Sequence, residues 1–174
     1  MHIANRAQVF WHYVVPCLLA ATATALYAMS IVAVHSYDAL IYTYAARQGM
    51  QNLERLLHPH HLLYNSVGAI NLWLWRTLGW HGNDIVPLQI MNTVFGGVCL
   101  SLVYMLVARY TRPLLALGAA MLLGLSHAYW LYSAEVEVYV LSVLFLVASL
   151  YAALRSWEHR WPFVLGILLS LIHI

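Results

Sequence analysis

Asp38 is the first residue whose position suggests a chemical role. It lies where a long apolar run ends, and Tyr37, Tyr42 and Tyr44 are close to it in the sequence. A carboxylate at a membrane boundary is a candidate functional group, because placing a charge near lipid is costly. The alternative is an ordinary solvated helix end, and the residues around Asp38 leave both interpretations open.

A histidine-rich segment follows, in which His58, His60 and His61 surround Pro59. Imidazole is a common zinc ligand, so a divalent metal is one interpretation, although proline favours an extended run and no cysteine lies nearby. Proline also suits the start of a helix, and helix N-terminal amides bind phosphate. The segment therefore predicts phosphate contact, metal binding, or imidazoles that snorkel to the membrane surface.

A third candidate is the acidic pair Glu135 and Glu137, with Tyr139 just after it. Residues at i and i+2 do not share a helix face, so at most one of these acids is expected to point into a site. The alternative is a solvated loop between two membrane spans.

Three arginines in the first half of the chain could bind phosphate through the planar fork of their guanidinium groups. They are Arg47, Arg55 and Arg76. Contact with lipid headgroups is the favoured role for Arg47 and Arg55, whereas Arg76 is kept as a candidate phosphate ligand.

A strongly apolar chain must position these residues. Of the 174 residues, 63% are hydrophobic and 8% are charged, whereas a soluble domain has about 25% charged residues. The composition predicts an all-α, polytopic transmembrane helical bundle surrounded by a lipid bilayer. A formal net charge of +2 gives no reason to expect a nucleic-acid partner. Cys17 and Cys99 lie in apolar stretches, so they are interpreted as core residues and indicate no redox compartment.

Four apolar runs are long enough to cross the hydrocarbon core, which needs about 20 helical residues. They are residues 13–34, 88–108, 114–131 and 138–154, and a further apolar segment begins at Trp161. In the first run, Pro16 falls in the first helical turn, where its missing N–H matters little. The small residues at 21–23 lie in the middle of that run, so it is interpreted as an uncleaved signal anchor.

Residues 62–78 are apolar enough to cross the membrane, but they carry Asn65, Asn71 and Arg76. The distribution of arginine decides between the two interpretations, because cytoplasmic segments are enriched in basic residues. If this helix lies along the outer surface, Arg6, Arg109, Arg112, Arg155 and Arg160 fall inside and five of the six carboxylates fall outside. If residues 62–78 cross the membrane and the whole chain has the opposite orientation, the rule is also obeyed. That arrangement, however, places the long polar segment after the first apolar run in the cytoplasm. The interfacial placement is therefore preferred.

The last six residues, 169–174, end in the middle of an apolar segment. The same six residues are encoded by one frame of a transposon-end adapter used in DNA library preparation. We therefore expect residues 1–174 to form a single transmembrane domain that is truncated, with the natural sequence ending near Leu168. A natural helix tail is the alternative.

Taken in order, these pieces resemble the C-type (GT-C) membrane glycosyltransferases, particularly bacterial proteins similar to protein O-mannosyltransferases and the aminoarabinose transferase of lipid A. In that pattern Asp38 matches an acid that ends the first span, and His58-Pro59 match the opening of a His-Pro-Pro motif. The segment 109–112 matches an Arg-rich inner turn, and 137–139 match a Glu-Val-Tyr-like segment. The resemblance covers roughly residues 10–155. The chain departs from the pattern where His60 and His61 replace the second proline and its successor, and it has one acid at Asp38 where many relatives have two.

The resemblance implies an inverting glycosyltransferase in the bacterial inner (plasma) membrane, with its active site facing the periplasm. The donor would be a polyprenyl-phosphate-linked sugar and the acceptor a glycan, lipid or protein. Asp38 would be the general base. The groups that bind substrate or phosphate would be His58, His60, His61, Arg76, Glu137 and Tyr139. No cofactor is assigned, a divalent metal stays open, and the fragment alone is expected to be inactive.

Two other functions would leave different marks in the sequence. A transporter would show charged or broken segments at mid-membrane, whereas the predicted spans are uninterrupted and carry their charges at the ends. A membrane assembly protein would lack a convergent pocket at Asp38.

Overall fold

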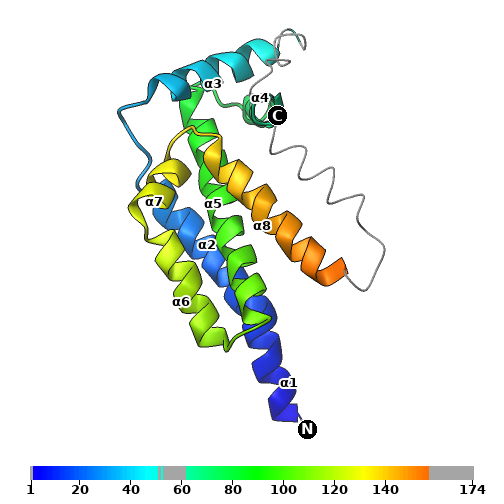
Figure 1. The fold of residues 1–174 in the computed structure, drawn as a ribbon. Helices are drawn as coiled ribbons and strands as arrows, with labels where there is room; N and C mark the ends of the chain where they lie inside the picture. The colour runs from blue at the N-terminus through cyan, green and yellow to red at the C-terminus, as the bar shows by residue number, and fades with distance from the viewer. Residues whose placement is uncertain (1, 51, 53–61, 157–174) are drawn as a thin grey trace.

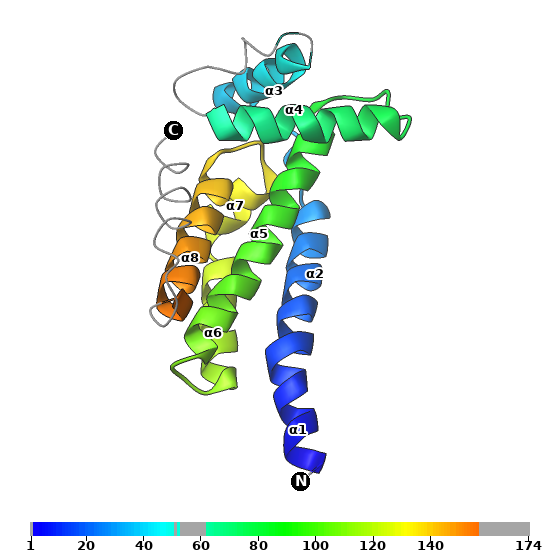
Figure 2. The ribbon, with the colours of Figure 1, turned by 90° about the vertical axis from the view of Figure 1, so that its right-hand side faces the viewer.

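The computed structural model describes residues 2–50, 52 and 62–156, and all regular structure in these ranges is helical. Upright helices stand side by side in a bundle, and two helices, α3 and α4, lie across one end of it (Figures 1 and 2). The N-terminus lies at the other end. The predicted all-α class is confirmed.

The first upright helix is continuous through α1 (His2–Val9), a π-helical turn η1 (Phe10–Val14) and α2 (Val15–Ala28). In the π-turn the N–H of Val15 donates to the carbonyl of Phe10. Pro16 has no N–H with which to continue that pattern, and the Trp11 carbonyl instead accepts a hydrogen bond from the Tyr104 hydroxyl at 2.8 Å. Pro16 therefore lies in the first turn of α2, as expected, and the π-turn precedes it without a break in the helix.

The apolar part of this helix, Arg6–Ala28, is long enough to cross a membrane. It begins before the predicted residue 13 and ends six residues before Val34. The hydroxyl of Ser30 donates to the carbonyls of Leu26 and Tyr27, both at 3.1 Å, and so serves backbone groups that the end of the helix leaves free.

Helix α5 (Ile85–Ala108) is at the centre of the bundle and is the second helix long and apolar enough to cross a membrane. It begins three residues before the predicted start at 88 and ends at the predicted residue 108. Gly97 lets the backbone of α5 approach α2 closely. A Cβ added at this position would lie 2.5 Å from the Ala20 carbonyl oxygen and would clash with the Thr24 hydroxyl. The Ser101 hydroxyl donates to the Pro16 carbonyl across the same contact. Small residues and hydroxyl groups are the usual means by which helices pack in membranes.

The predicted span at 114–131 is broken. Helix α6 (Pro113–Gly124) and helix α7 (His127–Ala134) meet at an angle of 67°. The break is stable because hydroxyl groups satisfy the carbonyls that it frees: Tyr27 donates to Gly124 O at 2.8 Å and Ser126 donates to Leu123 O at 2.7 Å. The expectation of uninterrupted spans was therefore wrong at this position.

Helix α8 (Tyr139–Ser156) matches the run predicted at 138–154. Its apolar part, Tyr139–Leu154, is shorter than a full crossing. Within the described residues, two helices are long and apolar enough to cross a membrane, or three if α6 and α7 form one bent span. The segment that begins at Trp161 lies outside the described residues.

Helix α3 (Tyr37–Gly49) packs against helix α4 (Leu62–Thr77) at the end of the bundle. Helix α4 has 16 residues and runs across the direction of α5 (Figure 2). It is tied to the first turn of α5 by Asn71, whose amide donates to Pro87 O at 2.9 Å. Gly79, with φ of 88°, supplies the left-handed residue that turns the chain after α4.

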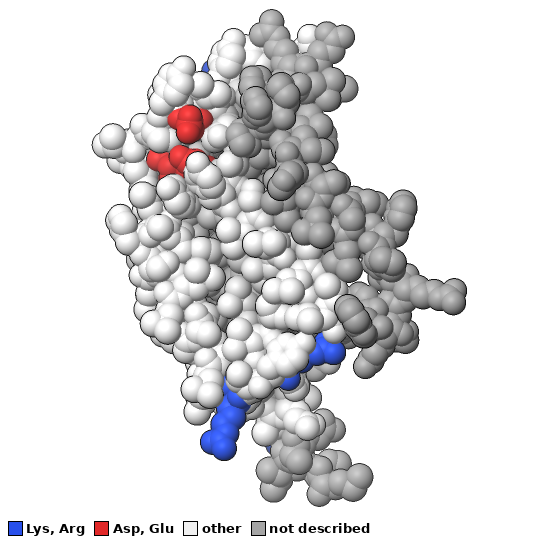
Figure 3. Space-filling view, in the orientation of Figure 1, with Lys and Arg blue, Asp and Glu red and all other residues white. Residues whose placement is uncertain are grey.

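Charges separate along the bundle. In Figure 3 the acidic side chains gather near the end where α3 lies, and blue side chains project from the opposite end. The exposed arginines at that opposite end include Arg109 and Arg112, in the turn between α5 and α6. This is the separation that the predicted topology requires.

Candidate functional site

The two glutamates of the third candidate segment lie in a non-helical connection between α7 and α8, residues 135–138, here called the carboxylate strap. Glu135 is 4% exposed and Glu137 is 5% exposed, so the alternative of a solvated loop is wrong. The backbone at Glu135 is extended, with φ −115° and ψ 166°. Both carboxylates face the segment that precedes α3, because Glu135 contacts His35 and Glu137 contacts Ser36. The two acids lie outside any helix, so the helix-face argument does not apply to them.

The strap is held by the side chain of Asn92, which is fully buried on α5. Its amide donates to the carbonyls of Glu135, at 2.6 Å, and Glu137, at 2.8 Å. Its oxygen accepts a hydrogen bond from the Tyr64 hydroxyl of α4 at 3.1 Å. Asn92 thus joins α4, α5 and the strap in one network.

Gln89 makes a similar connection one turn earlier on α5. Its amide donates to the carbonyl of Val32 at 2.8 Å, and the N–H of Val32 donates to the carbonyl of Ala134 at 3.4 Å. The sequence interpretation did not single out Gln89 or Asn92. Their signal was available, because amide side chains inside an apolar span need hydrogen-bond partners.

Glu135 pairs with His35, whose Nδ1 lies 3.3 Å from both carboxylate oxygens. The side chains of His35 and Glu135 are 19% and 6% exposed. Glu135 Oε1 also accepts the N–H of Val136 at 2.7 Å. This pair joins the strap to the segment before α3 and satisfies the buried carboxylate.

Glu137 is connected to the start of α3 through Ser36. The Ser36 hydroxyl donates to Glu137 Oε1 at 3.0 Å, and it accepts the N–H of Ala39 at 3.0 Å as the N-cap of α3. Among the described residues, the second oxygen of Glu137, Oε2, is buried and has no hydrogen-bond partner.

Burial, above all, raises the pKa of Glu137, because it disfavours the charged carboxylate. The hydrogen bond from Ser36 opposes this effect, whereas the nearby Asp38 and Glu135 raise the pKa of Glu137 further. A buried carboxyl group with one free oxygen and a raised pKa is a candidate for proton exchange.

Asp38 lies in the first turn of α3 and is exposed to solvent. A helix N-terminus favours an acid in this position. The sequence interpretation predicted a cation, arginine or histidine, as its electrostatic partner. Within the described residues Asp38 forms no ion pair, and its charge raises the pKa of both Glu137 and Tyr42. The cations between α3 and α4, Arg55, His58, His60 and His61, lie outside the described residues, so the predicted partner stays a prediction.

Tyrosines surround the two acids. Burial and the charges of Asp38 and Glu137 raise the pKa of Tyr42 to about 12, with a smaller effect from Tyr139. Tyr42 packs edge-to-face against Tyr64, with ring centroids 5.4 Å apart. The predicted site residue Tyr139 is half-exposed and lies 4.9 Å from the ring of Tyr132. The structure therefore brings Asp38, Glu137 and Tyr139 to one region.

Arg76, by contrast, binds Asp84. Its guanidinium donates to Asp84 Oδ1 and to the carbonyl of Trp80, the latter at 3.3 Å, while Arg47 Nε lies 3.7 Å from Asp84 Oδ2. Arg47 is nine residues after Asp38 on α3, which places their backbones about 14 Å apart along the helix. Since Asp84 binds both arginines, Arg76 lies near the Arg47 end of α3, whereas Asp38 is at the other end of that helix.

The predicted ligands His58, His60 and His61 lie outside the described residues. In the ranges that are described, no group of three or more histidine, cysteine or acidic side chains could hold a metal ion.

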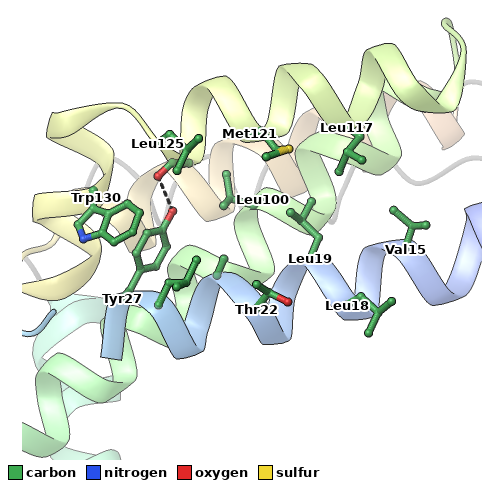
Figure 4. A pocket seen from close by; sticks show the side chains of 13 residues that line it. Val15, Leu18, Leu19, Thr22, Tyr27, Leu100, Leu117, Met121, Leu125 and Trp130 are labelled. Atoms are coloured by element: carbon green, nitrogen blue, oxygen red, sulfur yellow. Dashed lines mark hydrogen bonds between the residues drawn. The ribbon is translucent and has the colours of Figure 1, made fainter. Parts of the chain in front are cut away.

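An apolar groove of about 350 Å³ lies between α2, α5, α6 and α7. Figure 4 shows Leu18, Leu19 and Met121 along its length, and Tyr27 and Trp130 at the end nearer α7. No charged side chain lines it. It has the shape and polarity for an apolar chain and has no catalytic group of its own.

The sequence matches no protein-family model, no curated protein and no solved structure.

Proposed function

We propose that this protein is a membrane glycosyltransferase that moves a sugar from a polyprenyl-phosphate donor to an acceptor at the end of the bundle covered by α3 and α4. The observation that carries the proposal is the link from Glu137 through the Ser36 hydroxyl to the first turn of α3, where Asp38 is exposed. This arrangement holds one solvent-accessible carboxylate beside a buried one, with tyrosines around both.

Asp38 is the group that takes the proton, because it is exposed to an acceptor that arrives from water. The acceptor hydroxyl or amine loses its proton to Asp38 and attacks the anomeric carbon, while the bond from that carbon to the phosphate oxygen breaks. The polyprenyl phosphate leaves with the electron pair. General-base assistance of this kind contributes about 10²–10⁴-fold to rate.

Glu137 is a positioning residue in this scheme. Its carboxylate holds Ser36, and Ser36 caps the helix that carries Asp38. The leaving phosphate needs positive charge nearby, and that role stays with His58, His60 and His61. Arg76 is already engaged by Asp84.

The membrane arrangement supports a lipid-borne donor. Helix α5 is long enough to cross, and α4 lies across the direction of α5 where α5 begins, so α4 belongs at the membrane surface. The carboxylates then lie at the outer face and Arg109 and Arg112 at the inner face, as the positive-inside rule favours. The acceptor reaches Asp38 from the periplasm while the prenyl tail stays in the bilayer.

The test is transfer of labelled sugar from polyprenyl phosphate in membranes that contain the protein as encoded at its native locus. Asp38→Asn keeps the side-chain shape and should lower kcat by about a hundredfold or more. Glu137→Gln keeps an oxygen for Ser36 and should cost less, and Thr111→Ala, at the other end of the bundle, should have no effect. Near-normal turnover by Asp38→Asn at matched protein levels would remove Asp38 from the chemistry and leave Glu137 as the next candidate base.

A second candidate function is transport, and the 67° break between α6 and α7 favours it. Broken helices and protonatable carboxylates mark the binding sites of many transporters. Proteoliposomes distinguish the two functions. A transporter moves its substrate across a sealed membrane in response to a proton gradient, whereas the transferase modifies its acceptor equally well when that gradient is collapsed.

A further inference from the structure

A second pocket, of about 380 Å³, lies at the opposite end of the bundle from the carboxylate strap. It is formed by the π-turn of the first helix, the last turns of α5 and one residue of α8. The residues that define its chemistry are His12, Tyr13, Tyr104, Met105, Arg109 and Tyr151. The pocket shares no residue with the strap or with the apolar groove.

Its charge is positive. Arg109 is exposed and makes no ion pair with any described carboxylate. The four acids in the described ranges, Asp38, Asp84, Glu135 and Glu137, all lie in the segments at the other end of the bundle. Arg112 is only three residues from Arg109, in the same turn. Since no described carboxylate lies at this end of the bundle, the described lining attracts an anion.

The π-turn decides which side chains line the pocket. A π-turn holds one residue more than an α-turn. The side chains before it are therefore rotated by about 100° around the helix axis, relative to those of an uninterrupted α-helix. Here the turn spans Phe10–Val14 and includes both His12 and Tyr13. Its imidazole and phenol add hydrogen-bonding groups beside the arginine. Single π-turns of this kind occur frequently at functional sites.

The rest of the lining is apolar. The hydroxyl of Tyr104 is engaged by the Trp11 carbonyl, so Tyr104 contributes its ring as a wall, together with Met105. The pocket also lies where the two crossing-length helices, Arg6–Ala28 and Ile85–Ala108, come to the same end of the bundle. That level is a membrane boundary, where a phosphate headgroup and the start of an acyl chain lie side by side.

We propose that this pocket binds the phosphate headgroup of an anionic membrane lipid. Arg109 pairs with the phosphate, His12 and Tyr13 donate hydrogen bonds to its oxygens, and the first part of the lipid chain lies against Tyr104 and Met105. A guanidinium fork matches phosphate geometry, which makes arginine suited to this role. The site is independent of the proposed transferase activity.

The experiment is native mass spectrometry of the purified protein, titrated with phosphatidylglycerol, with phosphatidylcholine, and with inorganic phosphate. The wild type should bind one phosphatidylglycerol in preference to phosphatidylcholine. Arg109→Gln should weaken that binding by about tenfold or more, the scale of a lost charged hydrogen bond. Arg112→Gln removes the same charge from the same turn outside the pocket, and it should change binding by about twofold or less at physiological salt.

Arg109→Lys keeps the charge and should retain part of the preference. A circular dichroism melt of each variant shows whether its fold is intact. Equal losses in Arg109→Gln and Arg112→Gln would mean general surface attraction and would overturn the site. Displacement of phosphatidylglycerol by millimolar inorganic phosphate would overturn the lipid assignment, as would equal binding of the two lipids by the wild type.

Discussion

Ser36 donates its hydroxyl hydrogen to Glu137 Oε1 at 3.0 Å while its oxygen caps α3 by accepting the N–H of Ala39. The two residues are 101 positions apart in the sequence. One small side chain thus connects a buried carboxylate to the helix that carries Asp38. Any change in the charge of Glu137 acts directly on the start of α3.

Stability should depend on the ionisation of Glu137. Its pKa is raised in the folded protein, so its stabilising contribution is complete below the ordinary glutamate pKa of about 4.3 and is lost as the pH rises through the raised value. The difference in thermal midpoint between the wild type and Glu137→Gln should therefore change against the wild type as the pH is raised above about 4. Melting curves in detergent at a series of pH values measure it. A difference that is independent of pH would contradict the assignment.

Asn92 should be the most important polar residue of α5. Asn92→Ala removes hydrogen bonds to Glu135 O, Glu137 O and the Tyr64 hydroxyl, and at about 1 kcal/mol each it should cost about 2–4 kcal/mol of stability. Asn71→Ala is the matched control, since it removes the bond to Pro87 O and should cost about 1 kcal/mol. Chemical unfolding of both variants gives the comparison, and equal losses would argue against a central role for Asn92.

Two glycines should respond in opposite directions to alanine. At Gly97 a methyl group would clash with the backbone of α2, so Gly97→Ala should destabilise the protein by about 1–3 kcal/mol through overpacking. At Gly118, on α6, a Cβ would meet nothing within 4 Å. Gly118→Ala should stabilise the helix by up to about 1 kcal/mol. Thermal midpoints decide the signs, and a neutral Gly97→Ala would show that α2 and α5 are less closely packed.

The orientation in the membrane can be tested with single cysteines introduced after Cys17 and Cys99 have been replaced by alanine. Cysteine at the exposed Asn83, near α4, should react with a membrane-impermeant maleimide in intact cells. Cysteine at the exposed Thr111 should react only after the cells are opened, because it lies at the arginine end. Labelling of intact cells at position 111 and not at 83 would reverse the topology.

Several features followed from the sequence by itself. Apolar runs of about 20 residues can satisfy their backbone groups in lipid only as helices. This is why α5 and α8 appear close to their predicted positions, and why the helical class was correct. The gathering of most acidic residues at one end was also visible, since it depends only on which residues lie between the helices.

The tertiary structure decided how the polar side chains are used. Hydrophobic periodicity describes one segment at a time, so it did not reveal that Tyr27 would stabilise a break at Gly124, 97 residues away. Nor did it reveal that Asn92 would hold residues 135–138 against α5, where both glutamates are buried. Arg76 was a candidate phosphate ligand until the fold placed Asp84 against it. Hydrogen bonds between distant residues form only where packing brings a donor and an acceptor within about 3 Å of each other, and no local pattern contains that information.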